Sequence, residues 1–303
     1  MQEKKLYNGK WDGIWNLEKY QRIRDKITNE FQGLRFIEES HQYFLGDREL
    51  MCVSNVTHMF QEHFDSETMA YECSERHFDD FTSKYYQMTP EMILEAWKKI
   101  SDDACSHGTN VHEFGESCFY FMTRQYDRIL DGYKDRLHIN ENGNDYFISS
   151  EDPKEVAVVE FWEALPKSIV PIAAENKVFN IKDEYAYSGT FDILFYYDPA
   201  IDGKVSNNEG LMVFDYKTNK DLYKNFKLKK LLSPFDELLD MPLSIYKLQL
   251  TAYQMCLEKV GLHVVARRII WLLPNGTFQK IPLEEYCKML DYGLKQKDTK
   301  ITK

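Results

Sequence analysis

Two acidic residues lie inside runs of the sequence that are otherwise typical of buried β-strands. Asp192 lies in the run 186–197 and Asp215 in the run 211–216, and both runs are rich in aromatic and branched apolar residues. A carboxylate inside such a strand is costly to bury unless a cation or hydrogen-bond donors compensate it. The fold must therefore supply compensating groups to both strands, which limits how the chain can fold.

One compensating group follows directly in the sequence. Side chains alternate along a strand, so Asp215 and Lys217 project to the same face, and a neighbouring strand can place Asp192 opposite them. Two carboxylates beside a lysine form a hard oxygen site suited to Mg²⁺ or Mn²⁺. The alternative is a structural salt bridge between adjacent strands, and an Asp-x-Lys tripeptide alone does not exclude it.

Further polar residues accompany the two acids, each on a segment with helix or strand periodicity. His112 and Glu116 are four residues apart, which places them on one face of a helix predicted to begin at Gly108. The others are Glu175 on the strand before Asp192, and Gln249 and Tyr253 one turn apart on a later helix.

In order and spacing, these pieces resemble the PD-(D/E)XK nucleases, specifically the RecB-like and lambda-exonuclease-like branch that phages often encode. The matching pieces are Gly108-Thr-Asn-Val-His112-Glu-Phe-Gly-Glu116, Glu175, Gly189-Thr-Phe-Asp192, Asp215-Tyr-Lys217-Thr and Gln249-x-x-x-Tyr253. The resemblance covers roughly residues 108–273. It implies an α/β (α+β) restriction-endonuclease-like core, which runs helix, three-stranded mixed sheet, helix and strand, with a helical N-terminal elaboration. We accordingly expect an N-terminal hairpin and helical region over residues 1–107, packed on a nuclease core over residues 108–303.

The same resemblance implies roles for the site residues. Asp192, Asp215, the main-chain carbonyl of Tyr216 and His112 would hold one or two Mg²⁺ ions, for which Mn²⁺ can substitute. Glu175 would join them, and Lys217 would orient the attacking water or offset charge in the transition state. Glu116 would bind metal through water or hold His112 in orientation. From the residues alone, a histidine such as His112 is more often an ordinary core or surface residue of a helix, and Glu175 is equally compatible with an exposed strand glutamate.

DNA contacts are predicted at two places. Gln249 and Tyr253 are placed for a paired contact to a phosphate, although an ordinary helix contact is the alternative. The most basic segment follows Lys217 and is interleaved with aromatic residues, which favours contact with a DNA backbone over a merely solvated face. The predicted contacts there are Thr218, Lys220, Lys224 and Lys227.

Composition limits these expectations. The net charge is −11, from 38 basic and 49 acidic residues, so DNA binding must depend on local basic patches. The six cysteines include no closely spaced pair, and we expect no iron–sulfur cluster. No apolar stretch approaches the length of a membrane span, which favours the cytoplasm of a bacterial or phage-infected cell.

Three functions remain open on this basis. The first is an exonuclease acting on DNA ends in recombination, repair or phage DNA processing. The second is a restriction-type or structure-specific endonuclease, and the third is a non-catalytic nucleic-acid-binding protein on the same fold. DNA is the expected partner, and a recombination partner protein or homo-oligomer is compatible with the sequence without being indicated by it.

Periodicity and turn residues predict the remaining elements. The first 33 residues contain an amphipathic helix, residues 124–152 form a flap or a connector, Ser244 caps the helix of Gln249, and the tail after Leu290 is frayed. A helix starts at Thr89-Pro90, with Met92 and Ile100 among its inward residues, and a separate helix follows at Gly108. Further predicted segments are strands at 34–38, 42–45, 173–181, 185–197, 264–273 and 277–281, and a helix at 153–165.

Overall fold

The computed structural model describes residues 1–297. Within them the chain forms two compact units, one made of residues 1–61 together with residues from 112 onward, and one made of residues 62–111. The division suggested by the sequence lay between residues 107 and 108, whereas residues 1–61 belong to the same unit as the strands that carry the acids.

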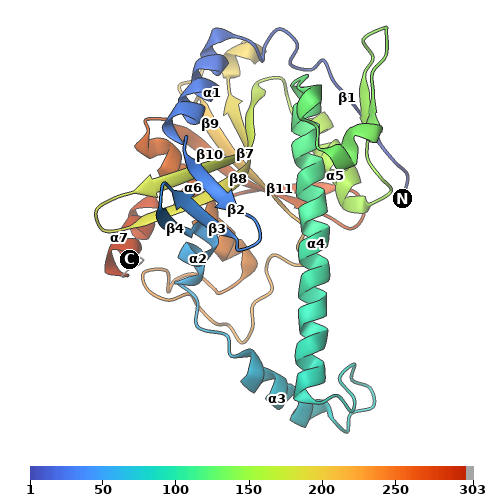
Figure 1. Cartoon of the computed structure of the whole chain (residues 1–303), viewed down its shortest axis with the longest axis vertical. Helices are drawn as coiled ribbons and strands as arrows, with labels where there is room; N and C mark the ends of the chain where they lie inside the picture. Colours follow the sequence, from blue (N-terminus) through green and yellow to red (C-terminus); the bar gives the residue numbers. More distant parts are fainter. Residues whose placement is uncertain (298–303) are drawn as a thin grey trace. The chain divides into compact units, whose positions relative to one another are not determined.

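A mixed sheet of eight strands forms the centre of the larger unit, and its order can be followed in Figure 1. The order is β11-β10-β9-β8-β4-β3-β2, with β7 also paired to β8. β9 and β10 are parallel, as are β4 and β8, and the other pairs are antiparallel. The bounds are β2 Leu34–Ile37, β3 Gln42–Leu45, β4 Arg48–Cys52, β7 Ile169–Ile181, β8 Ala186–Tyr197, β9 Gly210–Lys217, β10 Val264–Leu272 and β11 Phe278–Pro282. The mixed α/β class is therefore confirmed.

The strands that carry the two acids are direct neighbours. β8 and β9 run antiparallel, and Ile193 pairs with Phe214. This register places Asp192 beside Asp215, as the sequence predicted. β7 pairs with β8 along almost its whole length and brings Glu175 to the same region.

Helices cover both faces of β9. α5 (Pro153–Ala164) packs Phe161 against Phe214 and Tyr216. α6 (Pro242–Lys259) places Tyr246 beside Lys217, whose side chain projects to the opposite face. The larger unit also contains α1 (Glu18–Glu30), α2 (Val53–His58) and α7 (Cys287–Gln296). The buried centre of this unit lies between these helices and the sheet.

The smaller unit contains α3 (Ser66–His77) and the first part of α4 (Pro90–Met122). Trp97 donates its indole N–H to the hydroxyl of Tyr85 over 2.9 Å, and Ile93 is fully buried. Met92 and Ile100 were predicted to point inward, but both are exposed. The prediction failed because the short unit buries only a narrow stripe of the helix.

Several predicted elements differ from those observed. α4 is one continuous helix across Gly108, because an internal glycine weakens a helix by about 1 kcal/mol without ending it. α6 begins at Pro242 with Met241 as its N-cap residue, so Ser244 is a buried helix residue and not a cap. α7 occupies the tail predicted to be frayed up to Gln296, and residues 298–303 lie outside the described part.

The N-terminal region and the segment 124–152 also contain more structure than expected. The first helix begins only at Glu18, because residues before it form β1 (Lys5–Tyr7) and turns. β1 pairs with β6 (Tyr146–Ile148), which pairs with β5 (Leu137–His138), so the segment 124–152 contributes two strands of a second sheet. Within residues 1–297, none of the helices is both long enough and apolar enough to span a membrane.

Candidate metal centre

Asp192 is held in place by the neighbouring strand and by α4. Its Oδ2 atom accepts the main-chain N–H of Tyr216 over 2.7 Å and lies 3.1 Å from Nδ1 of His112. Burial alone would raise the pKa of Asp192, but the positive charges of His112 and Lys217 outweigh it and lower the pKa to about 2. Asp192 is therefore ionised near neutral pH, and both of these contacts are made by its Oδ2 atom.

Asp215 is the more deeply buried of the two acids, with 1% of its surface exposed. The Nζ atom of Lys217 lies 2.5 Å from its Oδ1, although neither carboxylate oxygen accepts a hydrogen bond of good geometry from residues 1–297. Burial and the charge of Asp192 raise the pKa of Asp215 to about 7, against the opposing charge of Lys217. A salt bridge does exist here, but it leaves Asp215 with unused acceptor capacity.

His112 and Glu175 complete the group. One possible ligand atom from each of His112, Glu175 and Asp192 lies within 4.8 Å of the others. Burial raises the pKa of Glu175 well above its usual range, and the charges of Asp192, Glu116 and Asp215 add to the effect. The sequence had left both His112 and Glu175 open to ordinary structural roles, and the structure brings both to the two strand acids.

The backbone at Glu175 is strained. Its φ angle of +48° is the left-handed conformation that residues other than glycine rarely adopt, and it interrupts the pairing of β7 between Ala174 and Asn176. Such a conformation costs on the order of 1–3 kcal/mol and is concentrated at functional sites. No pattern in the sequence indicates this turn of the backbone, which directs the carboxylate of Glu175 toward Asp192.

Glu116 and Tyr216 make contacts other than those expected. Glu116 accepts a hydrogen bond from the Tyr120 hydroxyl over 2.8 Å, whereas His112 uses Nδ1 toward Asp192. Tyr216 contributes its main-chain N–H to Asp192, and its carbonyl as a metal ligand stays a prediction. Burial raises the pKa of Glu116.

Two glycines permit this close packing. An added Cβ at Gly115 would lie 2.5 Å from Cε2 of Tyr216, and one at Gly189 would lie 2.9 Å from Cε1 of Tyr253. Gly115 therefore lets α4 approach β9, which places His112 beside Asp192. Gly189 does the same for α6 against β8.

A pocket of about 490 Å³ opens beside the acids and contains Glu116 and Glu175 in its wall. Gln249 and Tyr253 line it together, and Nε2 of Gln249 donates to the Tyr253 hydroxyl over 3.2 Å. Thr190 of the Gly189-Thr-Phe-Asp192 motif also lines it, and the lining residues that were not singled out from the sequence include Phe36, Val53 and Lys177. The aromatic residues of the first hairpin belong to this wall because β3 and β4 extend the sheet next to β8.

The basic segment lies in the loop that follows β9. Lys220, Lys224 and Lys227 are exposed, and Thr218 is half-buried. The loop is fixed at its base, where the side-chain amide of Asn225 donates to the carbonyls of Lys229 and Asp240. As far as residues 1–297 describe the site, these side chains lie outside the pocket of Gln249 and Tyr253.

The donor set fits a divalent cation. Carboxylate oxygens and one imidazole are ligands that Mg²⁺ or Mn²⁺ accept, and within residues 1–297 the buried Asp215 oxygens have the Lys217 ion pair but no hydrogen bond of good geometry. Burial and the charge of Asp192 raise the pKa of Glu175 and of Asp215, and a bound cation would oppose this rise. Compared with protein-family models and with curated proteins, the chain matches none.

Proposed function

We propose that the protein is a Mg²⁺-dependent deoxyribonuclease with a PD-(D/E)XK core, of the RecB-like and lambda-exonuclease-like branch. The observation that carries this proposal is the meeting of Asp192, Asp215 and Lys217 on two adjacent strands, with His112 and Glu175 beside them. Among these residues Glu175 lines the adjacent pocket, and a substrate would reach the metal centre from that side. DNA is the proposed partner.

Each residue has a chemical role in this proposal. Asp192, Asp215, His112 and Glu175 would hold the metal, and the chemistry that it would supply when bound is activation of a water and polarisation of the scissile phosphate. Lys217 keeps its positive charge, because the nearby carboxylates raise its pKa although burial opposes this. Its ammonium therefore orients the attacking water and offsets negative charge on the phosphate.

An exonuclease is the favoured form of this activity. The support is the pair Gln249 and Tyr253, which the resemblance links to nucleases that act on DNA ends and which lines the pocket beside Glu175. The pocket volume of about 490 Å³ falls in the range that encloses a small ligand such as a nucleotide. Exposed Lys220, Lys224 and Lys227 would contact the DNA backbone outside the pocket.

The experiment compares end-labelled linear DNA with covalently closed circular DNA, in Mg²⁺, in Mn²⁺ and with chelator. We expect metal-dependent loss of the linear DNA alone, absent in Asp215→Asn and retained in Asp47→Asn, which alters an exposed turn. Cleavage of the circular DNA would instead indicate an endonuclease. Binding of DNA without hydrolysis in any divalent metal would favour the non-catalytic function.

A further inference from the structure

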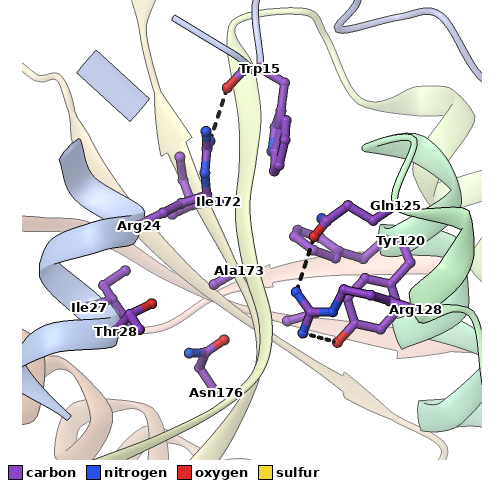
Figure 2. A pocket seen from close by; sticks show the side chains of 12 residues that line it. Trp15, Arg24, Ile27, Thr28, Tyr120, Gln125, Arg128, Ile172, Ala173 and Asn176 are labelled. Carbon is purple, nitrogen blue, oxygen red and sulfur yellow. Dashed lines mark hydrogen bonds between the residues drawn. The ribbon is translucent and has the colours of Figure 1, made fainter. Parts of the chain in front are cut away.

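A second pocket in the larger unit contains two arginines and none of the proposed metal ligands. It has a volume of about 220 Å³ and lies between α1 and the C-terminal end of α4, with β7 between them, as Figure 2 shows. Arg24 lines it from the side of α1 and Arg128 from the other side. We call it the arginine pocket.

Arg24 is fixed by an aromatic ring and a carbonyl. Its guanidinium lies 3.9 Å from the centre of the Trp15 ring, and Nη1 donates to the main-chain oxygen of Trp15 over 3.0 Å. No ion pair to a carboxylate is found for Arg24 within residues 1–297. Burial lowers the pKa of Arg24, and the charge of the neighbouring Asp25 opposes this only in part, so the cation is partly desolvated.

Arg128 is held in the same way on the opposite wall. Its guanidinium lies 4.4 Å from the centre of the Tyr120 ring, Nη2 donates to the Tyr120 hydroxyl over 2.9 Å, and Nη1 donates to Oε1 of Gln125 over 3.1 Å. All of these partners are neutral, and in the described part of the chain Arg128 has no ion pair with a carboxylate. Both arginines therefore retain N–H donors for a further acceptor.

Two oriented guanidinium groups around a small polar pocket are suited to an oxyanion. Arginine binds phosphate through paired N–H donors, and stacking on a ring restricts the side chain before the ligand arrives. Asn176 and Thr28 add polar groups to the wall. The volume of about 220 Å³ suits one phosphate group better than a complete nucleotide, because sites for whole small molecules are usually larger than roughly 300 Å³.

The arginine pocket is linked through adjoining hollows to the side of the metal centre at which Glu175 lies. A third hollow, of about 390 Å³, shares Tyr120 and Arg128 with the arginine pocket, and shares Glu116 and Glu175 with the pocket beside the metal centre. A hydrogen-bond chain follows the same path, because the Tyr120 hydroxyl accepts from Arg128 and donates to Glu116 over 2.8 Å. The three hollows form one groove along β7.

We propose that the arginine pocket binds a phosphate of the same nucleic-acid strand whose scissile phosphate lies at the metal centre, through Arg24 and Arg128. This inference rests on the proposed nuclease function and adds a second anchoring point for the strand. The phosphate is either the terminal one or an internal one, and both have the same chemistry. The groove then follows one strand away from the metal centre.

The test measures binding of the full chain to a fluorescent single-stranded oligonucleotide with chelator present, so that cleavage plays no part. The variants are Arg24→Gln and Arg128→Gln, and the matched control is Arg22→Gln, an exposed arginine of α1 paired with Glu18. Affinity is measured over a series of salt concentrations. Oligonucleotides with or without a terminal phosphate, and with one neutral methylphosphonate at successive positions, locate the phosphate.

We expect Arg24→Gln and Arg128→Gln each to weaken binding at least tenfold. The slope of log affinity against log salt should fall by about 0.7, the value for one lost phosphate contact on a single strand. Arg22→Gln should bind as the unchanged protein does. Removing the terminal phosphate, or placing the methylphosphonate at one particular position, should weaken binding to the unchanged protein and have little effect on the two variants.

The proposal is overturned if both variants bind with the affinity and salt slope of the unchanged protein, or if the unchanged protein binds no oligonucleotide. Arg128 is exposed, so Arg128→Gln should fold even if Arg24→Gln does not, and thermal unfolding checks both. If binding depends on the two arginines but no metal-dependent cleavage is found, the proposed phosphate site is supported and the proposed nuclease function is contradicted.

Discussion

Lys217 and Asp215 project from the same face of β9, and the Nζ atom of Lys217 lies 2.5 Å from Oδ1 of Asp215. The ammonium is thus placed at the carboxylate that has unused acceptor capacity and a raised pKa. We predict that Lys217→Ala lowers metal-dependent cleavage by at least 10²-fold, since it removes the charge that orients water and stabilises the transition state. Initial rates on labelled linear DNA measure this.

Affinity for DNA should change little in Lys217→Ala, because its side chain is mostly buried and the exposed lysines are intact. Lys220→Ala, three residues further along, is the matched control and should retain cleavage at saturating DNA. A fully active Lys217→Ala variant would contradict the assignment of Lys217.

A second prediction concerns the pH dependence of stability at Glu175. Its folded-state pKa is raised by burial and then by the charges of Asp192, Glu116 and Asp215. A carboxylate with a raised folded pKa contributes stability below its unfolded pKa, about 4.3, and loses that contribution as the pH rises toward the folded pKa. Glu175→Gln cannot ionise and avoids this loss.

With chelator present, Glu175→Gln should therefore become more stable than the unchanged protein as the pH rises above about 4. The slope should approach about 1.4 kcal/mol per pH unit until the folded pKa is reached. Denaturant unfolding between pH 4 and pH 8 measures the difference, with Glu39→Gln in the exposed turn after β2 as the control. Added Mg²⁺ should stabilise the unchanged protein more than the variant, and a difference that is flat with pH would contradict the crowding of charges.

Local sequence patterns predicted those features of the fold that are determined by residues close together in the sequence. α5 begins at Pro153 as predicted, and Asp152, which was not predicted as its cap, accepts from the N–H groups of Lys154 and Glu155. The same-face placement of Asp215 and Lys217 followed from strand alternation alone. Whether the resulting group binds a metal remains a prediction.

Features that depend on distant parts of the chain were not predictable in this way. β4 joins the sheet through only Met51 and Cys52, which pair with β8 well over a hundred residues later. The left-handed backbone of Glu175, between the paired residues Ala174 and Asn176, has no sequence signature. Arg24 and Arg128 likewise come from segments that are far apart in the sequence. No local sequence pattern therefore predicts that both line one pocket.

A third prediction concerns Asp291, which joins α7 to the turn between β7 and β8. Its Oδ1 accepts from the Tyr185 hydroxyl over 2.6 Å and from Lys182 over 2.5 Å, and its Oδ2 pairs with Lys295 over 2.8 Å. Burial tends to raise the pKa of Asp291, but these hydrogen bonds lower it overall. Its contribution is therefore complete above the unfolded pKa of about 3.9 and is lost as the pH falls below that value.

Asp291→Asn should lower the free energy of unfolding by about 2 kcal/mol at pH 7, the usual size for hydrogen bonds to a charged group. The difference from the unchanged protein should shrink as the pH is lowered from 4 toward 2. Denaturant unfolding at both ends of this range tests it, with Asp183→Asn in the exposed part of the same turn as the control. An equal loss at every pH would assign the effect to packing rather than to charge.

The last prediction concerns Gly115, which sets the distance between α4 and β9. A Cβ there would lie 2.5 Å from Cε2 of Tyr216, whose ring is buried against Phe161 of α5. Overpacking of this kind costs about 1–3 kcal/mol, so Gly115→Ala should destabilise the protein by that amount. It should also weaken metal-dependent cleavage, because moving α4 or Tyr216 separates His112 and the Tyr216 N–H from Asp192.

Gly132→Ala, where an added Cβ meets nothing within 4 Å, should change stability by less than about 0.5 kcal/mol and leave cleavage intact. Equal stability and activity of the two variants would show that the approach of α4 does not position His112.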